Sequence, residues 1–152
     1  MMMIRRYEPA DREAVWNLHS VTMKAVDGSD ADVSWATDLR DVDASFLQTG
    51  GDFLLGWLDG QLVAMGGLRK VSEAAAEIGR MRVHPDFQRR GFGQAILQSL
   101  EASAHKLGFR QLLLETPVEQ TSAQQLYMKH GFCEVRRGEL YGMQMIFYIK
   151  DL

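Results

Sequence analysis

The sequence predicts one domain of α/β or α+β class, built around a single central sheet. Three observations support this class. Apolar residues recur with the period of strands in some segments and with the period of helices in others. Two of the strand-like segments are joined by Asp59-Gly60, a dipeptide typical of tight β-hairpins. At 152 residues, with no internal repeat or linker, the chain has the length of one ordinary domain.

The elements follow from these periodicities in chain order. Strands are expected at 2–8, 52–58, 61–71, 75–83, 110–116, 132–140 and 143–152, and helices at 9–26, 91–106 and 121–130. The polar stretch 27–43 is expected to form loop and short helix. Gly66-Gly67, inside a strand, indicates a bulge or a close backbone approach. Thr121 and Gln124 have the spacing of a capping box at the start of a helix.

Composition and charge restrict the class of partner. The apolar fraction of 46% and charged fraction of 24% are ordinary for a globular protein. The net charge of −3 argues against a nucleic-acid binder, which usually has a basic face. With no signal-peptide core and no apolar run of about 18 residues, we expect a cytoplasmic protein without membrane contact. Cys133, the single cysteine, is expected to be buried, and no histidine has metal-ligand spacing with it, so no metal is expected.

The stretch HPDFQRRGFGQAIL, residues 84–97, places two arginines and two glycines between a strand and a helix. Free N–H groups at a helix N-terminus bind anions, and glycine lets phosphate approach the backbone. The P-loop is excluded because Gly93 is not followed by Lys-Ser/Thr, and the dinucleotide fingerprint fits poorly because Ile96 replaces its third glycine. Residues 88–93 match a third loop, Gln/Arg-x-x-Gly-x-Gly/Ala. The alternative is a glycine turn that only begins a helix.

The surroundings of this loop resemble the GCN5-related N-acetyltransferase (GNAT) family. Residues 77–132 contain, in order, a strand ending in Val-His-Pro, the loop, an amphipathic helix, LLLET and Ala-x-x-Leu-Tyr-x-x-x-Gly-Phe. The resemblance implies a mostly antiparallel central sheet with a splayed pair of parallel strands, flanked by about four helices. It also implies an N-acetyltransferase that transfers an acetyl group from acetyl-CoA to a primary amine of a small molecule or peptide by direct attack in a ternary complex.

The resemblance further implies which residues contact the co-substrate. Its pyrophosphate would lie on the backbone amides of residues 89–94, and its pantetheine arm would pair with the strand backbone of residues 81–83. A backbone N–H would stabilise the oxyanion at the thioester. The implied contacts are Met81, Arg82, Val83, Gln88, Arg89, Arg90, Gly91, Phe92, Gly93, Gln94, Gln120, Ala123 and Tyr127. Gln120 departs from the family pattern, because many relatives have asparagine there.

Two residues are implied for catalysis. Glu77 stands where some family members have a glutamate base, which would remove a proton from the amine. Strand alternation would place Glu77 on the same face as Met81. The alternative is a strand carboxylate in an ion pair with Arg80 or Lys70. Tyr127 matches the family tyrosine that approaches the sulfur and would protonate the departing thiolate; the alternative is ordinary aromatic packing.

The acceptor is left open by the sequence. Residues 27–43 contain six aspartates against a single arginine, and an acidic wall would favour a cationic amine, whereas the alternative is a solvated loop. Trp35 is the best aromatic candidate to line a substrate pocket. Other functions to consider are a catalytically silent CoA sensor or interaction module, and a nucleic-acid binder using Arg89, Arg90, Arg136 and Arg137. The protein is expected to be a monomer or a homodimer.

Overall fold

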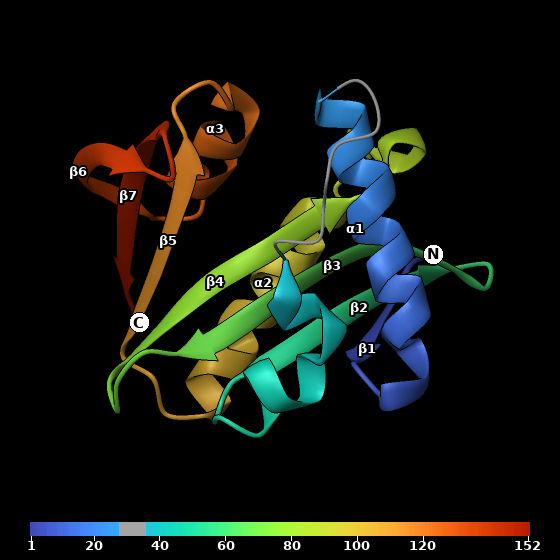
Figure 1. The fold of residues 1–152 in the computed structure, drawn as a ribbon. Coiled ribbons are helices and arrows are strands. Elements are labelled where there is room, and N and C mark those ends of the chain that lie inside the picture. Colours follow the sequence, from blue (N-terminus) through green and yellow to red (C-terminus); the bar gives the residue numbers. More distant parts are fainter. Residues whose placement is uncertain (28–35) are drawn as a thin grey trace.

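A computed structural model describes residues 1–27 and 36–152, whose strands form one sheet in the order β1-β2-β3-β4-β5-β7-β6 (Figure 1). Neighbouring strands are antiparallel except β4 and β5, which are parallel. The strands are β1 Met3–Arg6, β2 Asp52–Leu58, β3 Gln61–Lys70, β4 Ala75–Val83, β5 Gln111–Pro117, β6 Cys133–Leu140 and β7 Met143–Asp151. The predicted mixed sheet, mostly antiparallel with one parallel pair, is confirmed.

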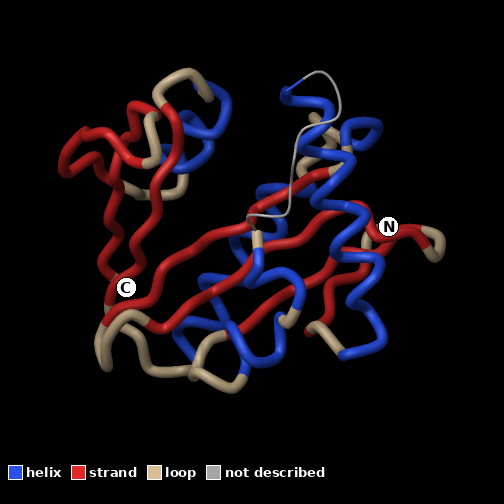
Figure 2. The backbone as a smooth tube through the Cα atoms, in the orientation of Figure 1, coloured by secondary structure: helices blue, strands red, loops and turns tan. Residues whose placement is uncertain are grey.

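Helices cover both faces of the first four strands (Figure 2). The α-helices are α1 Arg12–Asp27, α2 Phe92–Lys106 and α3 Thr121–Lys129. Short helical turns follow α1 at Thr37–Arg40 and Asp43–Leu47. We call the face covered by α1 and these turns the α1 face, and the opposite face the α2 face. Because side chains alternate along a strand, β2 contributes to the core on both faces. Phe53 and Leu55 are buried on the α1 face, and Leu54 is buried on the α2 face.

Two glycine predictions in the β2–β3 hairpin are confirmed. Asp59 and Gly60, with φ of 50° and 80°, form a two-residue turn with both central residues left-handed, as the twist of a hairpin favours. At Gly66, an added Cβ would lie 2.7 Å from Met81 Sδ and 2.8 Å from Ile96 Cγ2. Glycine therefore lets α2 and β4 approach β3 closely at this point.

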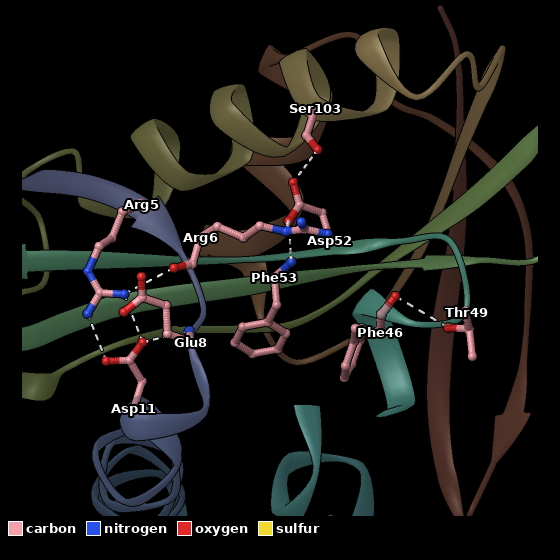
Figure 3. A network of polar contacts seen from close by, with 9 residues as sticks. All are labelled: Arg5, Arg6, Glu8, Asp11, Phe46, Thr49, Asp52, Phe53 and Ser103. Carbon is pink, nitrogen blue, oxygen red and sulfur yellow. Dashed lines mark hydrogen bonds and ion pairs between the residues drawn. The ribbon is translucent and has the colours of Figure 1, made fainter. Parts of the chain in front are cut away.

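The N-terminal strand is fixed by two buried or half-buried carboxylates (Figure 3). Arg5 of β1 donates two hydrogen bonds, of 2.7 and 2.8 Å, to Asp11 just before α1. These bonds lower the pKa of Asp11 despite its burial. Arg6 donates to Asp52 at 2.9 Å, and Ser103 of α2 donates to the other oxygen of the same carboxylate. Polar contacts thus join β1 to α1, β2 and α2.

Two local predictions are wrong. Cys133 is exposed rather than buried, because it begins β6, an edge strand whose side chains are largely exposed. The capping box does not form, because Gln120 occupies the N-cap of α3 and Thr121 is already the first helical residue. The Gln124 side chain instead donates at 2.8 Å to the carbonyl oxygen of Val118, which ties α3 to the end of β5.

Candidate active site

The parallel strands β4 and β5 pair at only one end. Three residue pairs join them, the last between Glu77 and Leu113. Beyond that point β4 continues to Val83 and β5 to Pro117, and the two strands diverge (Figure 1). The predicted splayed pair is therefore present. Along the diverging part, one backbone edge of β4 has no strand partner among the described residues.

A bulge in β4 changes which side chains share a face. Arg80 and Met81 lie opposite a single residue of β3, and Arg80 has a φ of 56°. Because of the extra residue, Ile78, Met81 and Val83 all pack in the core on the α2 face. Glu77 points to the opposite, α1 face, where it meets Arg69 of β3 at 2.5 Å. The prediction that Glu77 shares a face with Met81 is wrong, and its ion-pair partner is neither Arg80 nor Lys70.

The loop after β4 forms an open N-terminus for α2. Arg89 and Gly91 both have left-handed backbone, with φ of 63° and 82°. Gly91 is the N-cap of α2, and no side chain caps the helix there. The N–H groups of the first turn are therefore available to an anion, and alternating backbone conformations of this kind form anion-binding nests. Arg89 and Arg90 are exposed beside this turn.

Gly93, in the first turn of α2, is not required by the packing of the protein. A Cβ there would meet only Val83 Cγ2 at 3.5 Å and Leu126 Cδ2 at 4.0 Å, which are ordinary contacts. Its φ is not left-handed either. The missing side chain instead leaves the backbone accessible where the end of β4, α2 and α3 converge. Lys129 of α3 reaches the Gln94 side chain across the same junction, at 3.5 Å.

Tyr127 of α3 and Arg82 of β4 lie close to each other across the diverging strands. Tyr127 is 8% exposed, and its ring contacts Phe132 and Tyr148 at centroid distances of 6.0 and 6.1 Å. Burial raises the pKa of Tyr127 above its ordinary value, and the positive charge of Arg82 only partly opposes this. Burial, helped by the like charge of Arg80, lowers the pKa of Arg82 to about 10. The tyrosine hydroxyl therefore keeps its proton at neutral pH.

The acidic stretch after α1 is partly engaged within the protein. Asp38 accepts two hydrogen bonds, both of 2.9 Å, from Arg80 at the β4 bulge. Asp41 accepts from the backbone N–H of Ala44, and Asp43 from the side chain of Gln48. Described carboxylates of this stretch thus hold its own turns and the bulge in place. Three of the predicted residues, Asp30, Asp32 and Trp35, lie outside the described residues.

A hollow opens on the α1 face where β4 and β5 begin to diverge. Its volume is about 290 Å³, and its lining includes Glu77, Leu113, Glu115, Val135, Arg136 and Phe147. Burial raises the pKa of Glu115, and the negative charge of Glu77 adds to this effect. Glu115 was not foreseen as a site residue, and Arg136 was considered only as a nucleic-acid contact. The strand order β4-β5-β7-β6 brings them beside Glu77, and that order is not readable from local periodicity.

This geometry can be compared with known proteins. The sequence model of the Acetyltransferase (GNAT) family matches residues 12–132. The chain belongs to the GNAT acetyltransferase family. A curated relative, the uncharacterized N-acetyltransferase YedL of Escherichia coli (strain K12), is 34% identical over 80 residues. That match spans about half of each protein, 51% of this chain and 50% of YedL.

Solved structures share the whole fold of this GNAT protein. A GNAT-family acetyltransferase from Staphylococcus aureus Mu50 has a TM-score of 0.88 and 20% identity, with 99% of each chain covered. YncA of Salmonella typhimurium, solved with acetyl-CoA, has a TM-score of 0.79 and 18% identity, covering 99% of this chain and 93% of that one. PaiA N-acetyltransferase of Thermoplasma acidophilum, solved with coenzyme A, has a TM-score of 0.80 and 17% identity, covering 100% and 99%.

The remaining predicted contact residues of this GNAT protein fall around the same opening. Gln88 donates to the Val83 carbonyl at 3.3 Å, and Phe92 and Ala123 pack against the core on the α2 face. Gln120 is exposed at the start of α3. Among residues 1–27 and 36–152, no cluster of three or more metal-ligating side chains occurs. No helix in these two ranges is long and apolar enough to cross a membrane.

Proposed function

We propose that this GNAT protein transfers an acetyl group from acetyl-CoA to a primary amine of a small molecule or peptide within a ternary complex. One observation carries the proposal: β4 and β5 diverge from the vertex beside Glu77, where the hollow lies, toward the end of β4, from which the chain leads into the uncapped N-terminus of α2. An extended molecule with a phosphate-bearing end fits such a path. The YncA and PaiA structures, with acetyl-CoA and coenzyme A, support this choice of co-substrate.

The residues of the opening suit the parts of acetyl-CoA. The backbone amides of residues 89–94 would hold its pyrophosphate, because the first turn of α2 is uncapped and Gly93 leaves its surface accessible. Arg89 and Arg90 would add charge-assisted hydrogen bonds to further phosphate oxygens. The unpaired edge of β4, at residues 81–83, would pair with the amides of the pantetheine arm as an added strand does. Gln120 and Ala123 of the α3 region would complete the contact.

The protein's own groups would move two protons. Acetyl-CoA, when bound, supplies an acetyl thioester, whose bond from carbon to sulfur breaks as the amine nitrogen bonds to that carbon. Glu77 would accept the proton that the amine loses, directly or through water. Tyr127 would donate a proton to the departing sulfur, because its raised pKa keeps the hydroxyl protonated at neutral pH. Each residue comes from a different side of the opening, Glu77 from β4 and Tyr127 from α3.

The test of the proposal uses Gly93→Asp, with Gln98→Asp as matched control. Both add one negative charge to α2, but only Gly93 lies in its first turn, and Gln98 is exposed farther along the helix. We expect acetyl-CoA to raise the melting temperature of the wild type and of Gln98→Asp, and to bind Gly93→Asp about 100-fold more weakly or worse. Thiol release with a panel of amines separates an enzyme from a CoA sensor. No thermal shift in the wild type would contradict the proposal.

A further inference from the structure

We propose that the hollow beside Glu77 binds the acceptor, and that this acceptor is a small amine that also carries an acidic group. In this arrangement Glu115 holds the amine and Arg136 holds the acidic group. The inference rests on the proposed function, because it names the substrate class of the same site. It concerns side chains of β5, β6 and β7, which are separate from the loop that would hold the co-substrate.

The position of the hollow suits an acceptor. Strand alternation fixes which face Glu115 and Phe147 occupy. The residues that alternate with them along β5 and β7 are buried in the core on the α2 face: Leu112, Leu114 and Ile146. Glu115 and Phe147 therefore point toward the α1 face. On that side α1 lies in front of β3 and β4, whereas no described helix lies in front of β5, β6 and β7 (Figure 1). The hollow is thus reached from the side opposite α2. It also adjoins the vertex where β4 and β5 begin to diverge.

The acidic side of the hollow contains one carboxylate with a partner and one without. Glu77 already accepts from Arg69 at 2.5 Å. Glu115 is half-buried and, within the described residues, accepts no hydrogen bond and forms no ion pair. Burial raises the pKa of Glu115, although the positive charges of Arg69 and Arg136 partly oppose this, and a bound ammonium group would lower the remaining cost of burying the carboxylate. Glu115 is therefore the group of the hollow best placed to receive an amine.

The basic side of the hollow is Arg136. Its guanidinium lies over the Phe147 ring, 3.7 Å from the centroid, and it has no ion pair with any described carboxylate. Stacking fixes the plane of the guanidinium and leaves its N–H groups free to bind a planar carboxylate with two parallel hydrogen bonds. The adjacent Arg137 differs, because it is paired with Glu134 at 2.9 Å. Arg136 is thus an available anion site, whereas Arg137 is occupied.

The charges around the hollow favour a molecule that carries both signs. Arg69 is paired with Glu77, whereas Glu115 and Arg136 attract each other across the hollow without forming an ion pair, so a molecule between them would meet one negative and one positive group. A diamine would place its second ammonium group against Arg136, and a dicarboxylate would place an acid against Glu115. A volume of about 290 Å³ suits a small molecule or the end of a larger one. The proposed acceptor therefore carries an acidic group besides its amine, and it differs from the purely cationic amine that an acidic wall of residues 27–43 would favour.

The experiment compares acceptors of equal length. Glycine, β-alanine and γ-aminobutyrate are each tested against the alkylamine and the diamine with the same number of carbons, with thiol release giving kcat/KM. We expect the best amino acid to exceed both partners at least tenfold. Arg136→Gln should remove this preference, and Arg136→Glu should reverse it toward the diamine. Arg137→Gln, the matched control on the neighbouring residue, should leave the preference unchanged.

Acetyl-CoA binding, followed by thermal shift, is the separate measurement. If the protein binds acetyl-CoA and acetylates diamines or alkylamines as well as amino acids, the inference is wrong and the proposed function stands. A preference for amino acids that Arg136→Gln does not alter would also overturn the inference. If acetyl-CoA does not bind at all, the proposed function fails and the inference falls with it. Titration calorimetry of the preferred amino acid should further show weaker binding to Glu115→Gln.

Discussion

The two parts of the sheet on either side of the β4–β5 vertex are built differently. Strands β1 to β4 have helical segments on both faces, with α1 and its following turns on one and α2 on the other. Strands β5, β7 and β6 share the α2-face core but carry no described helix on the α1 face. We call these the covered part and the open part. The covered part holds rings and aliphatic side chains between the sheet and its helices, and the open part presents charged side chains on the α1 face, among them Glu115 and Arg136.

The difference separates stability from chemistry. Phe53, in the covered part, is fully buried between Tyr7 and Phe46, whereas Phe147, on the same face of the open part, is half-buried beneath the Arg136 guanidinium. Bare sheet surface is where a ligand can reach side chains held by strands, which position them more firmly than loops do. The comparison predicts that substitutions in the covered part lower the stability of the fold, and that substitutions in the open part lower the rate of acetyl transfer or the binding of the acceptor.

The largest effect is expected for Phe53→Ala, which removes a ring from the centre of the α1-face core. It should lower the free energy of unfolding by about 3–5 kcal/mol, measured by urea denaturation. The matched substitution Phe147→Ala should lower the free energy of unfolding by less than about 2 kcal/mol and should instead weaken the binding of the acceptor. Equal losses of stability in both variants would break the distinction between the two parts.

Tyr127→Phe should separate chemistry from folding in a single residue. Because only the hydroxyl is removed and the ring contacts remain, the free energy of unfolding should change by about 1 kcal/mol or less. The turnover number should fall about 100-fold, while acetyl-CoA binding persists. The control is Tyr7→Phe, which changes a buried tyrosine of the covered part and should leave the turnover number of the protein unchanged. Unchanged turnover in Tyr127→Phe would remove its role as proton donor.

Asp11→Asn tests the covered part electrostatically. Hydrogen bonds from Arg5 lower the pKa of Asp11, so the carboxylate stabilises the fold above its ordinary pKa and loses this contribution as pH falls through the lowered value. The variant should be less stable by about 1–3 kcal/mol near pH 7, and the difference should shrink toward about pH 2. Melting curves across pH measure this, with the exposed Asp59→Asn as control. A difference independent of pH would contradict the assignment.

The smallest effect, and the only gain, is expected for Glu115→Gln in the open part. Burial raises the pKa of Glu115, so the wild type is most stable below the ordinary pKa and loses stability as pH rises through the raised value. The variant should therefore be more stable by up to about 0.5 kcal/mol at neutral pH and equal at low pH. A loss of stability at neutral pH would show that Glu115 has a structural partner.

Much of the fold could be predicted because its signals are local. The hairpin turn at Asp59-Gly60, the close approach at Gly66 and the uncapped glycine turn before α2 each depend on a few neighbouring residues. The family resemblance added the splayed strands. Two predictions were wrong because they depend on more than neighbouring residues. The capping box at Thr121 does not form because the helix begins one residue earlier than that box requires, and Cys133 is exposed because it lies on the edge strand β6.

The candidate site was less predictable, because it depends on contacts between distant segments. One extra residue at the β4 bulge moves Met81 to the face opposite Glu77. The alternation of side chains in the sequence does not reveal that a bulge is present. Glu115 and Arg136 join Glu77 only through the order β4-β5-β7-β6, in which sequence neighbours are not always spatial neighbours. Local patterns therefore located the loop that we propose for the co-substrate but did not reveal the hollow.

The short seam between β4 and β5 has a consequence for amide hydrogen exchange. Only three residue pairs join the two strands, so the N–H groups along the unpaired edge of β4 have no strand partner among the described residues. A pantetheine arm paired along that edge would occupy these groups and make the sheet continuous across its middle. Exchange of the β4 N–H groups on that edge should then slow on binding, whereas exchange inside β2 and β3 should not change.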